Sequence, residues 1–178
     1  MYEVEVKVPA DHDDVRARLR EADARDLGVV DQRDTYFDAP HRDFAATDEA
    51  LRVRRERRDG GRRAVCTYKG PLVDEASKTR EERELEVADA DDATALFEGL
   101  GFEAAHVVEK TRHRYVLDGY VVSLDEVAGL GAFVEVEREV DDGDLDSARE
   151  GAFEVLVRLG LDPADQVRTS YLGLLLDD

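Results

Sequence analysis

The chain begins with a strand in which charged residues alternate with valine. Glu3, Glu5 and Lys7 lie on one face of residues 2–8, and the valines between them lie on the other. The same alternation, bounded by Gly, Pro and Asp, predicts further strands along the chain. These strands are expected at residues 29–38, 50–58, 62–69, 79–88, 105–117, 120–127 and 132–140. Asp59-Gly60-Gly61 is a hairpin turn, and Gly70-Pro71 is expected to end the strand before it.

Apolar residues at helical spacing predict four helices between and after these strands. The expected helices run from Asp11 or Asp13 to near Gly28, from Asp89–Asp92 to Gly101, from Asp144 or Asp146 to Gly160, and over 164–176. No Pro/Ser-rich linker divides the chain. We therefore expect a single domain over residues 1–178.

On each predicted strand the charged residues stay in phase, which means that they recur at every second position and lie on the same face. The in-phase residues are Glu3, Glu5, Lys7, Arg52, Arg54, Lys69, Arg80, Glu82, Glu84, Glu86, Lys110, Arg112, Arg114, Asp125, Glu135, Glu137 and Glu139. The opposite face is apolar on most of these strands, as at Val4, Leu51 and Val134. A sheet that packs its apolar face under helices and turns its charges inward must close into a barrel.

A second interpretation of the same pattern is that the apolar face is the core and the charged face is solvated, with ion pairs across strands. Like charges stacked in register, such as two glutamates on one strand face, weaken that interpretation because they repel each other. Acidic strands separated from basic strands suit a tunnel that holds a cation on one side and an anion on the other.

The composition limits the partners. The formal net charge is −19, from 25 basic and 44 acidic residues, so nucleic acid is not expected as a partner. The basic residues are 21 arginines and only four lysines, and this composition resembles that of halophile proteins. The single Cys66 excludes an intramolecular disulfide. No apolar run has membrane-spanning length and the N-terminus is a strand, so we expect no membrane partner and a cytoplasmic location.

The charged residue types indicate a metal and a polyphosphate. Paired carboxylates on neighbouring strands are hard oxygen ligands that suit Mg²⁺ or Mn²⁺. Three of the four lysines lie on the charged face, and a lysine ammonium is a compact charge suited to a phosphate oxygen. A ring of lysine and arginine suits a triphosphate. The chain has no P-loop motif, and its four histidines lack metal-ligand spacing.

The sequence resembles the CYTH domain of the triphosphate tunnel metalloenzymes, a family that includes class IV adenylate cyclases and thiamine triphosphatases. The family's Glu-x-Glu-x-Lys motif is similar to Glu3-Val4-Glu5-Val6-Lys7. The remaining matches, in order, are Glu49 to Arg54, Lys69, Arg80 with Glu82 and Glu84, Lys110 with Arg112, Asp125, and Glu135 with Glu137. The resemblance covers essentially the whole chain.

The resemblance implies a mixed α+β fold, a closed eight-stranded antiparallel β-barrel that forms a tunnel, with helices packed outside. It implies Mg²⁺ or Mn²⁺ held by Glu3, Glu5, Asp125, Glu135 and Glu137. It implies phosphates held by Lys7, Arg52, Arg54, Lys69, Arg80, Lys110 and Arg112, with Glu82 and Glu84 as further members of the site. On this basis the residues expected to carry catalysis are Glu3, Glu5, Lys7, Lys69 and Lys110.

Three functions are compatible with this site. In a class IV adenylate cyclase, the ribose 3′-hydroxyl of ATP attacks the α-phosphorus and pyrophosphate leaves. In a triphosphatase, water attacks the γ-phosphorus of inorganic, thiamine or nucleoside triphosphate. The third is a non-catalytic module that binds triphosphate or polyphosphate. The resemblance favours the cyclase and makes a homodimer plausible, whereas the general base stays open between a metal-bound group and a carboxylate.

Overall fold

A computed structural model describes residues 1–177 of the chain. Its strands are β1 (Tyr2–Pro9), β2 (Arg25–Asp38), β3 (Ala50–Arg58), β4 (Gly61–Asp74), β5 (Lys78–Val87), β6 (Glu103–Leu117), β7 (Tyr120–Val127) and β8 (Gly131–Val140). Its helices are α1 (His12–Glu21), α2 (Phe44–Thr47), α3 (Ala90–Gly99), α4 (Leu145–Arg158) and α5 (Tyr171–Leu176), with 3-10 turns η1 (Asp142–Asp144) and η2 (Pro163–Asp165).

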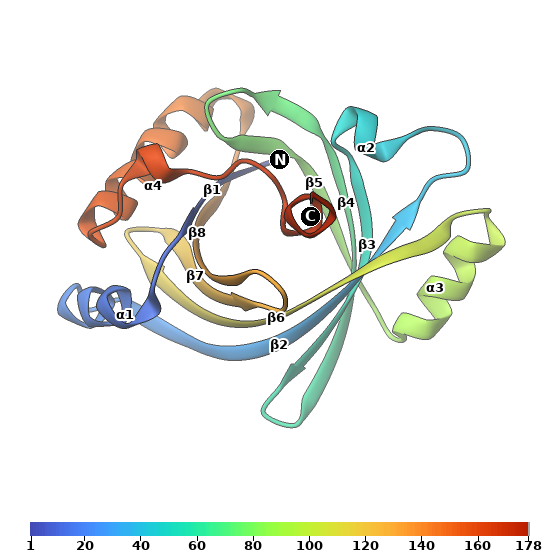
Figure 1. The fold of residues 1–178 in the computed structure, drawn as a ribbon, viewed down its shortest axis with the longest axis horizontal. Helices are drawn as coiled ribbons and strands as arrows, with labels where there is room; N and C mark the ends of the chain where they lie inside the picture. Colours follow the sequence, from blue (N-terminus) through green and yellow to red (C-terminus); the bar gives the residue numbers. More distant parts are fainter. Residues whose placement is uncertain (178) are drawn as a thin grey trace.

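The eight strands close into one antiparallel barrel in the order β1-β5-β4-β3-β2-β6-β7-β8 (Figure 1). Closure depends on β1, which pairs with β5 on one side and with β8 on the other. The β1–β8 register places Glu5 opposite Glu137 and Lys7 opposite Glu135. The expected α+β fold with a closed eight-stranded barrel and helices outside is therefore confirmed.

The hydrophobic core lies outside the barrel, between its wall and the helices. Val6, Val134 and Val136 on the strands pack against α1 and α4, including Leu19 and Leu156. Figure 1 shows these two helices on the same side of the ring of strands, with α2 and α3 on the other side. The apolar faces thus point out toward helices, and the interpretation with a solvated charged face is wrong.

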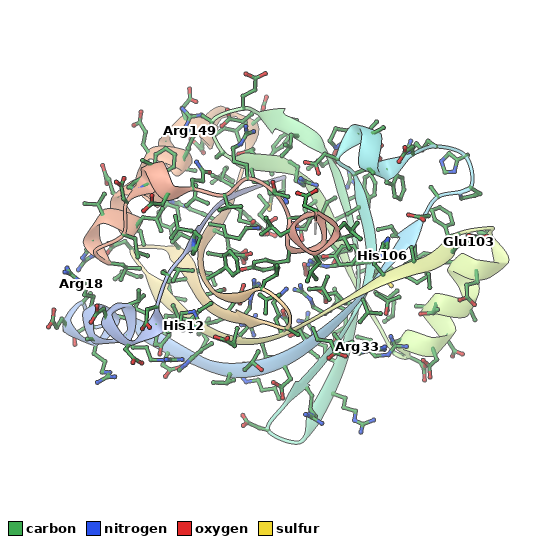
Figure 2. The ribbon with its side chains drawn as sticks, in the orientation of Figure 1. His12, Arg18, Arg33, Glu103, His106 and Arg149 are labelled. Carbon is green, nitrogen blue, oxygen red and sulfur yellow. The ribbon has the colours of Figure 1, made fainter. Side chains whose placement is uncertain are left out.

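The tunnel interior is lined by charged side chains, and several of them are almost fully buried. Asp125 is 0% exposed, Lys7 is 2% exposed and Arg112 is 6% exposed. Buried ions persist only when they are paired or await a ligand, because burying a charge alone costs several kcal/mol. Figure 2 shows side chains crowded inside the ring of strands.

One turn prediction is wrong. Gly70-Pro71 does not end a strand, since β4 continues to Asp74 with shifted register after Lys69. Pro71 is tolerated because it lies in this irregular stretch, beyond the point where Ala50 of β3 pairs with Lys69. The missing N–H of the proline therefore removes no regular ladder bond.

The predicted last helix over 164–176 is also wrong, because the segment divides into η2 and α5. Between them the chain runs along β1, where the Val167 N–H donates to the Lys7 carbonyl at 2.8 Å. Ser170 then begins α5 by accepting from the Gly173 N–H at 3.0 Å. The short α2, which was not predicted, begins in the same way, with Asp43 accepting from the Ala45 N–H.

Helix α5 enters one end of the barrel. Its Tyr171 packs against Val108, Val127 and Phe133, which face the tunnel, and Leu172 packs on the same group. Figure 1 shows the C-terminus inside the ring of strands. None of the helices within residues 1–177 combines the length and apolar character needed to cross a membrane.

Candidate functional site

A cavity of about 990 Å³ runs through the barrel. Most of the side chains predicted to act together line it: Glu3, Glu5, Lys7, Arg52, Arg54, Lys69, Arg80, Glu82, Glu84, Lys110, Arg112, Glu135 and Glu137. These residues come from six strands that are far apart in the sequence. Asp125 does not reach the cavity wall but contacts Arg112, which does.

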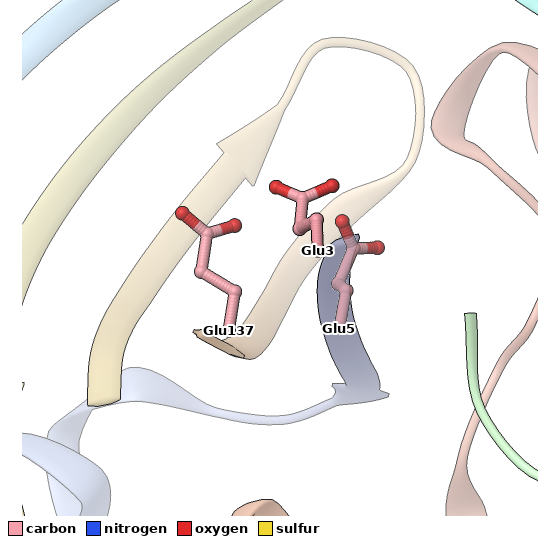
Figure 3. A group of neighbouring side chains, drawn as sticks. All are labelled: Glu3, Glu5 and Glu137. Carbon is pink, nitrogen blue, oxygen red and sulfur yellow. The ribbon is translucent and has the colours of Figure 1, made fainter. Parts of the chain in front are cut away.

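Three carboxylates gather on the β1–β8 side of the cavity. Oxygens of Glu3, Glu5 and Glu137 all lie within 4.8 Å of one another, and Figure 3 shows the three side chains converging. Burial raises the pKa of Glu137, and the charges of Glu3 and Glu135 raise it further. Burial raises the pKa of Glu3 as well, against the opposing charge of Lys69. A divalent cation would relieve this repulsion, and three carboxylate groups are the oxygen donors that Mg²⁺ and Mn²⁺ prefer.

Lys69 connects this acidic group to β5. Its ammonium lies 2.7 Å from Glu3 and 3.0 Å from Glu82. Burial acts to lower the pKa of Lys69, but the charges of Glu3 and Glu82 outweigh it and raise the pKa. Lys69 is therefore a firmly positive group beside the three carboxylates.

A second cluster lies on β2, β3 and β6 around Asp34, which is 0% exposed. Arg54 donates two hydrogen bonds to it at 2.7 Å each, Lys110 lies at 3.4 Å and Arg52 at 3.8 Å. Burial would raise the pKa of Asp34, but the charges of Lys110, Arg54 and Arg52 lower it well below its usual range. One carboxylate thus holds three cations, and the cluster keeps excess positive charge.

The third cluster is built on Arg112. The guanidinium donates twice to Asp125 at 2.6 Å and once to Glu135 at 2.7 Å. Tyr171 donates its hydroxyl to Asp125 at 2.7 Å, and its ring lies 4.3 Å from the ammonium of Lys7. Asp125 and Glu135, which the resemblance assigned to metal, therefore pair with Arg112 in this structure, apart from the group of Glu3, Glu5 and Glu137.

Lys110 has an unusual electrostatic position between these clusters. Burial lowers the pKa of Lys110 to about 7, and the charges of Arg54 and Arg112 contribute, while Asp34 opposes them. Its ammonium also lies 5.3 Å from the Tyr171 ring. An added anion beside Lys110 would favour its charged form.

The predicted phosphate ligand Arg80 is tied to the loop before β3. It donates to the Asp48 carbonyl at 2.7 Å and to the Asp48 carboxylate at 2.8 Å. Glu84 lies on the exposed part of the cavity wall, and the neighbouring in-phase residue Glu86 pairs with Arg63 at 2.9 Å. Arg80 thus braces the tunnel wall in this structure.

Three residues of the site were missed by the sequence analysis: Asp34, Lys78 and Tyr171. A signal existed for Lys78, because it is in phase with Arg80 and Glu82 and belongs to the rare lysines. Its burial and its place on the cavity wall put all four lysines of the chain in the tunnel. Asp34 and Tyr171 lie in two segments, Asp34-Thr35-Tyr36-Phe37-Asp38 and Ser170-Tyr171-Leu172, that also resemble the family, but the resemblance assigned neither residue a role in the site.

Comparisons with known proteins agree with this geometry. The CYTH domain family matches residues 1–171. The chain is 38% identical over 176 residues, 98% of both chains, to a Methanocaldococcus jannaschii protein named "Putative adenylate cyclase MJ0240". It is 28% identical over 144 residues to adenylate cyclase CyaB of Aeromonas hydrophila, covering 80% of this chain and 71% of that protein.

Solved structures extend the likeness to three dimensions. The PH1819 protein of Pyrococcus horikoshii OT3 superposes with a TM-score of 0.91 at 40% identity, covering 98% of both chains. A family match that spans nearly all of the sequence, a barrel of the expected topology and a close structural relative point the same way. The chain belongs to the CYTH domain family.

Proposed function

We propose that this protein is a divalent-metal-dependent enzyme that acts on a triphosphate inside the tunnel, and that its reaction is conversion of ATP to cyclic AMP and pyrophosphate. The observation that carries the proposal is the division of one cavity into an acidic and a basic side. Glu3, Glu5 and Glu137 form the acidic side, and Arg52, Arg54 and Lys110 around Asp34 form the basic side. The names of the relatives from Methanocaldococcus and Aeromonas support the cyclase reaction.

In this proposal Glu3, Glu5 and Glu137 hold Mg²⁺ or Mn²⁺, because their oxygens are close enough to share one ion. Bound there, the metal would neutralise phosphate charge and act as a Lewis acid. Asp125 and Glu135 are positioning residues that fix the Arg112 guanidinium toward the cavity. Catalysis is then mainly a matter of placing the triphosphate and stabilising its charge.

The basic residues orient the triphosphate. Arg52, Arg54 and Lys110 share one carboxylate, Asp34, so their combined charge is not neutralised within their own cluster. A phosphate group placed against them would receive hydrogen bonds from several donors at once, and such charge-assisted bonds are the strong ones. Lys7 and Arg112 extend this surface toward the acidic side, and the cyclisation itself needs the 3′-hydroxyl oriented in line with the leaving pyrophosphate.

A triphosphatase is the second candidate. The fold hosts that chemistry elsewhere: the Hippeastrum protein HpAC1, described as revealing a dominant triphosphatase activity, shares the fold with a TM-score of 0.66 at 17% identity. Hydrolysis would use the same metal and the same basic surface, with water in place of the ribose hydroxyl. The two reactions differ in the phosphorus atom attacked and in their products.

Product analysis separates these reactions. The protein is incubated with ATP and Mn²⁺ or Mg²⁺ at high salt, because the acidic surface is screened under those conditions. Cyclic AMP with pyrophosphate is the expected result. Release of orthophosphate without cyclic AMP would refute the cyclase and favour the triphosphatase, whereas tight triphosphate binding without turnover under either metal would favour a binding module.

The metal assignment is tested by Glu137→Gln, which removes one charged ligand with little change of shape. Mn²⁺ binding measured by calorimetry should weaken by about tenfold or more, since loss of a carboxylate ligand is worth at least ~1.4 kcal/mol, and turnover should be lost. Glu126→Gln is the matched control, because Glu126 is exposed on β7. Unchanged Mn²⁺ affinity in Glu137→Gln would contradict the assignment.

A further inference from the structure

Lys78 is a buried lysine of the tunnel wall that has no anionic partner. It is the first residue of β5, it is 9% exposed and it lines the cavity. Within residues 1–177 it takes part in no ion pair and no side-chain hydrogen bond. The strongest favourable charge acting on it is that of Glu5, the residue opposite it on β1.

The other cations near Lys78 have partners of their own. Arg80 is paired with Asp48 at 2.8 Å, and Lys69 is paired with Glu3 at 2.7 Å and with Glu82 at 3.0 Å. Lys78 is therefore surrounded by positive charge without gaining a carboxylate. Burial lowers the pKa of Lys78 to about 8, and the charges of Lys7, Arg80 and Lys69 contribute to the shift.

Lys7 is the second under-compensated lysine of this wall. It is 2% exposed, and its nearest carboxylate is Glu5 at 3.9 Å. Lys7 and Lys78 thus depend on the same glutamate. If Glu5 binds a divalent metal as proposed, its charge is also shared with that ion, and both ammonium groups need a further anion.

The chemistry of that anion follows from the two side chains. A lysine ammonium is a compact charge that donates up to three hydrogen bonds, which suits a single phosphate oxygen better than a planar carboxylate. The cavity is polar and large enough for a triphosphate, since its volume is about 990 Å³. We propose that Lys78 is a further substrate-binding residue, which together with Lys7 holds the phosphate group next to the metal at Glu5. This inference rests on the proposed function.

The test is binding of inorganic triphosphate, measured by calorimetry in EDTA so that no metal-dependent turnover occurs. Lys78→Met should weaken binding by about 10- to 100-fold, the range expected for losing one charge-assisted hydrogen bond. Arg83→Met is the matched control, because Arg83 lies on the outer, exposed face of the same strand and the net charge changes equally. Lys78→Arg, which keeps the charge, should retain most of the affinity.

A thermal melt distinguishes substrate binding from a structural role. Without ligand, Lys78→Met should melt at a higher temperature than the wild type, because it removes a buried charge that forms no ion pair. If Lys78 instead stabilises the folded state, Lys78→Met should have a lower melting temperature than the wild type. If Lys78→Met does not fold, Lys78→Gln replaces it in both measurements.

The outcomes separate the inference from the function on which it rests. If the wild type binds no triphosphate in EDTA and none with Mn²⁺ present, the proposed function is refuted, and the inference fails with it. If the wild type binds triphosphate and Lys78→Met binds it equally well, the inference alone is overturned and the proposed function stands. Weaker binding in Lys78→Met, together with a higher melting temperature, would establish the role.

Discussion

Asp34→Asn tests the electrostatic design of the basic side of the tunnel. The substitution keeps the shape of the side chain but removes the one carboxylate that Arg54, Arg52 and Lys110 share. Removing one partner of a buried ion pair costs about 3–5 kcal/mol, because the remaining charges stay buried and unpaired. The Asn oxygen can still accept one hydrogen bond from Arg54, so we expect the lower end, about 3 kcal/mol.

This loss is large for a protein of 178 residues. Typical stabilities are about 5–15 kcal/mol, and a loss of about 3 kcal/mol lowers the melting temperature by roughly 6–12 °C at this chain length. The assay is urea unfolding followed by circular dichroism, with a thermal melt in parallel. Asp31→Asn is the control, because Asp31 pairs with Arg57 at 3.3 Å on the exposed face of β2 and should cost under about 1 kcal/mol.

Triphosphate gives the same experiment a second arm. The three cations released by Asp34→Asn are free to bind phosphate, so saturating inorganic triphosphate should restore part of the lost stability. Equal losses for Asp34→Asn and Asp31→Asn would refute the reasoning, because the buried cluster would then be worth no more than a surface pair. A loss of about 3 kcal/mol in Asp34→Asn that saturating triphosphate does not reduce would also refute the reasoning.

The pH dependence of this difference has a definite sign. The folded state lowers the pKa of Asp34 below its ordinary value of 3.8. A carboxyl group with a lowered pKa stabilises the fold above its unfolded pKa, and this contribution is lost as the pH falls through the folded pKa. The wild type should therefore keep its advantage over Asp34→Asn from neutral pH down to about 4 and lose it only in stronger acid.

Two further predictions concern residues beside the same cluster. The pKa of Lys110 is lowered to about 7, and bound triphosphate should raise it, so binding near neutral pH should take up a proton. Calorimetry in two buffers with different ionisation enthalpies measures this proton uptake. Lys110→Arg stays charged at every pH tested, so it should abolish the proton uptake that Lys110 causes. Tyr171→Phe removes the hydrogen bond to Asp125 while leaving the ring over Lys7, and it should cost about 1.5–3 kcal/mol of unfolding free energy. A stability equal to that of the wild type would show that Arg112 alone fixes Asp125.

The alternation of residues predicted the barrel because the two faces of each strand have different partners. Glu3, Glu5 and Lys7 read as one face in the sequence, and the structure places all three on the cavity wall. The pattern failed where backbone hydrogen bonding to a distant strand decides the local structure. Residues 164–176 have helical spacing, but the contact between Val167 and β1 divides them.

The members of the site were easier to predict than their pairing. Phase along a strand tells which residues face the tunnel, but it does not tell which strands become neighbours. Lys69 of β4 meets Glu3 of β1 because β1 pairs with β5 beside β4, and only closure of the barrel fixes that order. Asp34 was missed for a related reason, since its importance comes from the three cations that β3 and β6 bring to it.

Because of where the four lysines lie, a reagent that modifies amines can probe the tunnel. Lys7, Lys69, Lys78 and Lys110 all line the cavity, so the exterior of the folded protein carries positive charge only on arginine, histidine and the terminal amine. An amine-directed acylating reagent would therefore find the N-terminus outside and its remaining targets within the bore. The rate at which such a reagent modifies the chain becomes a direct measure of whether the bore is occupied.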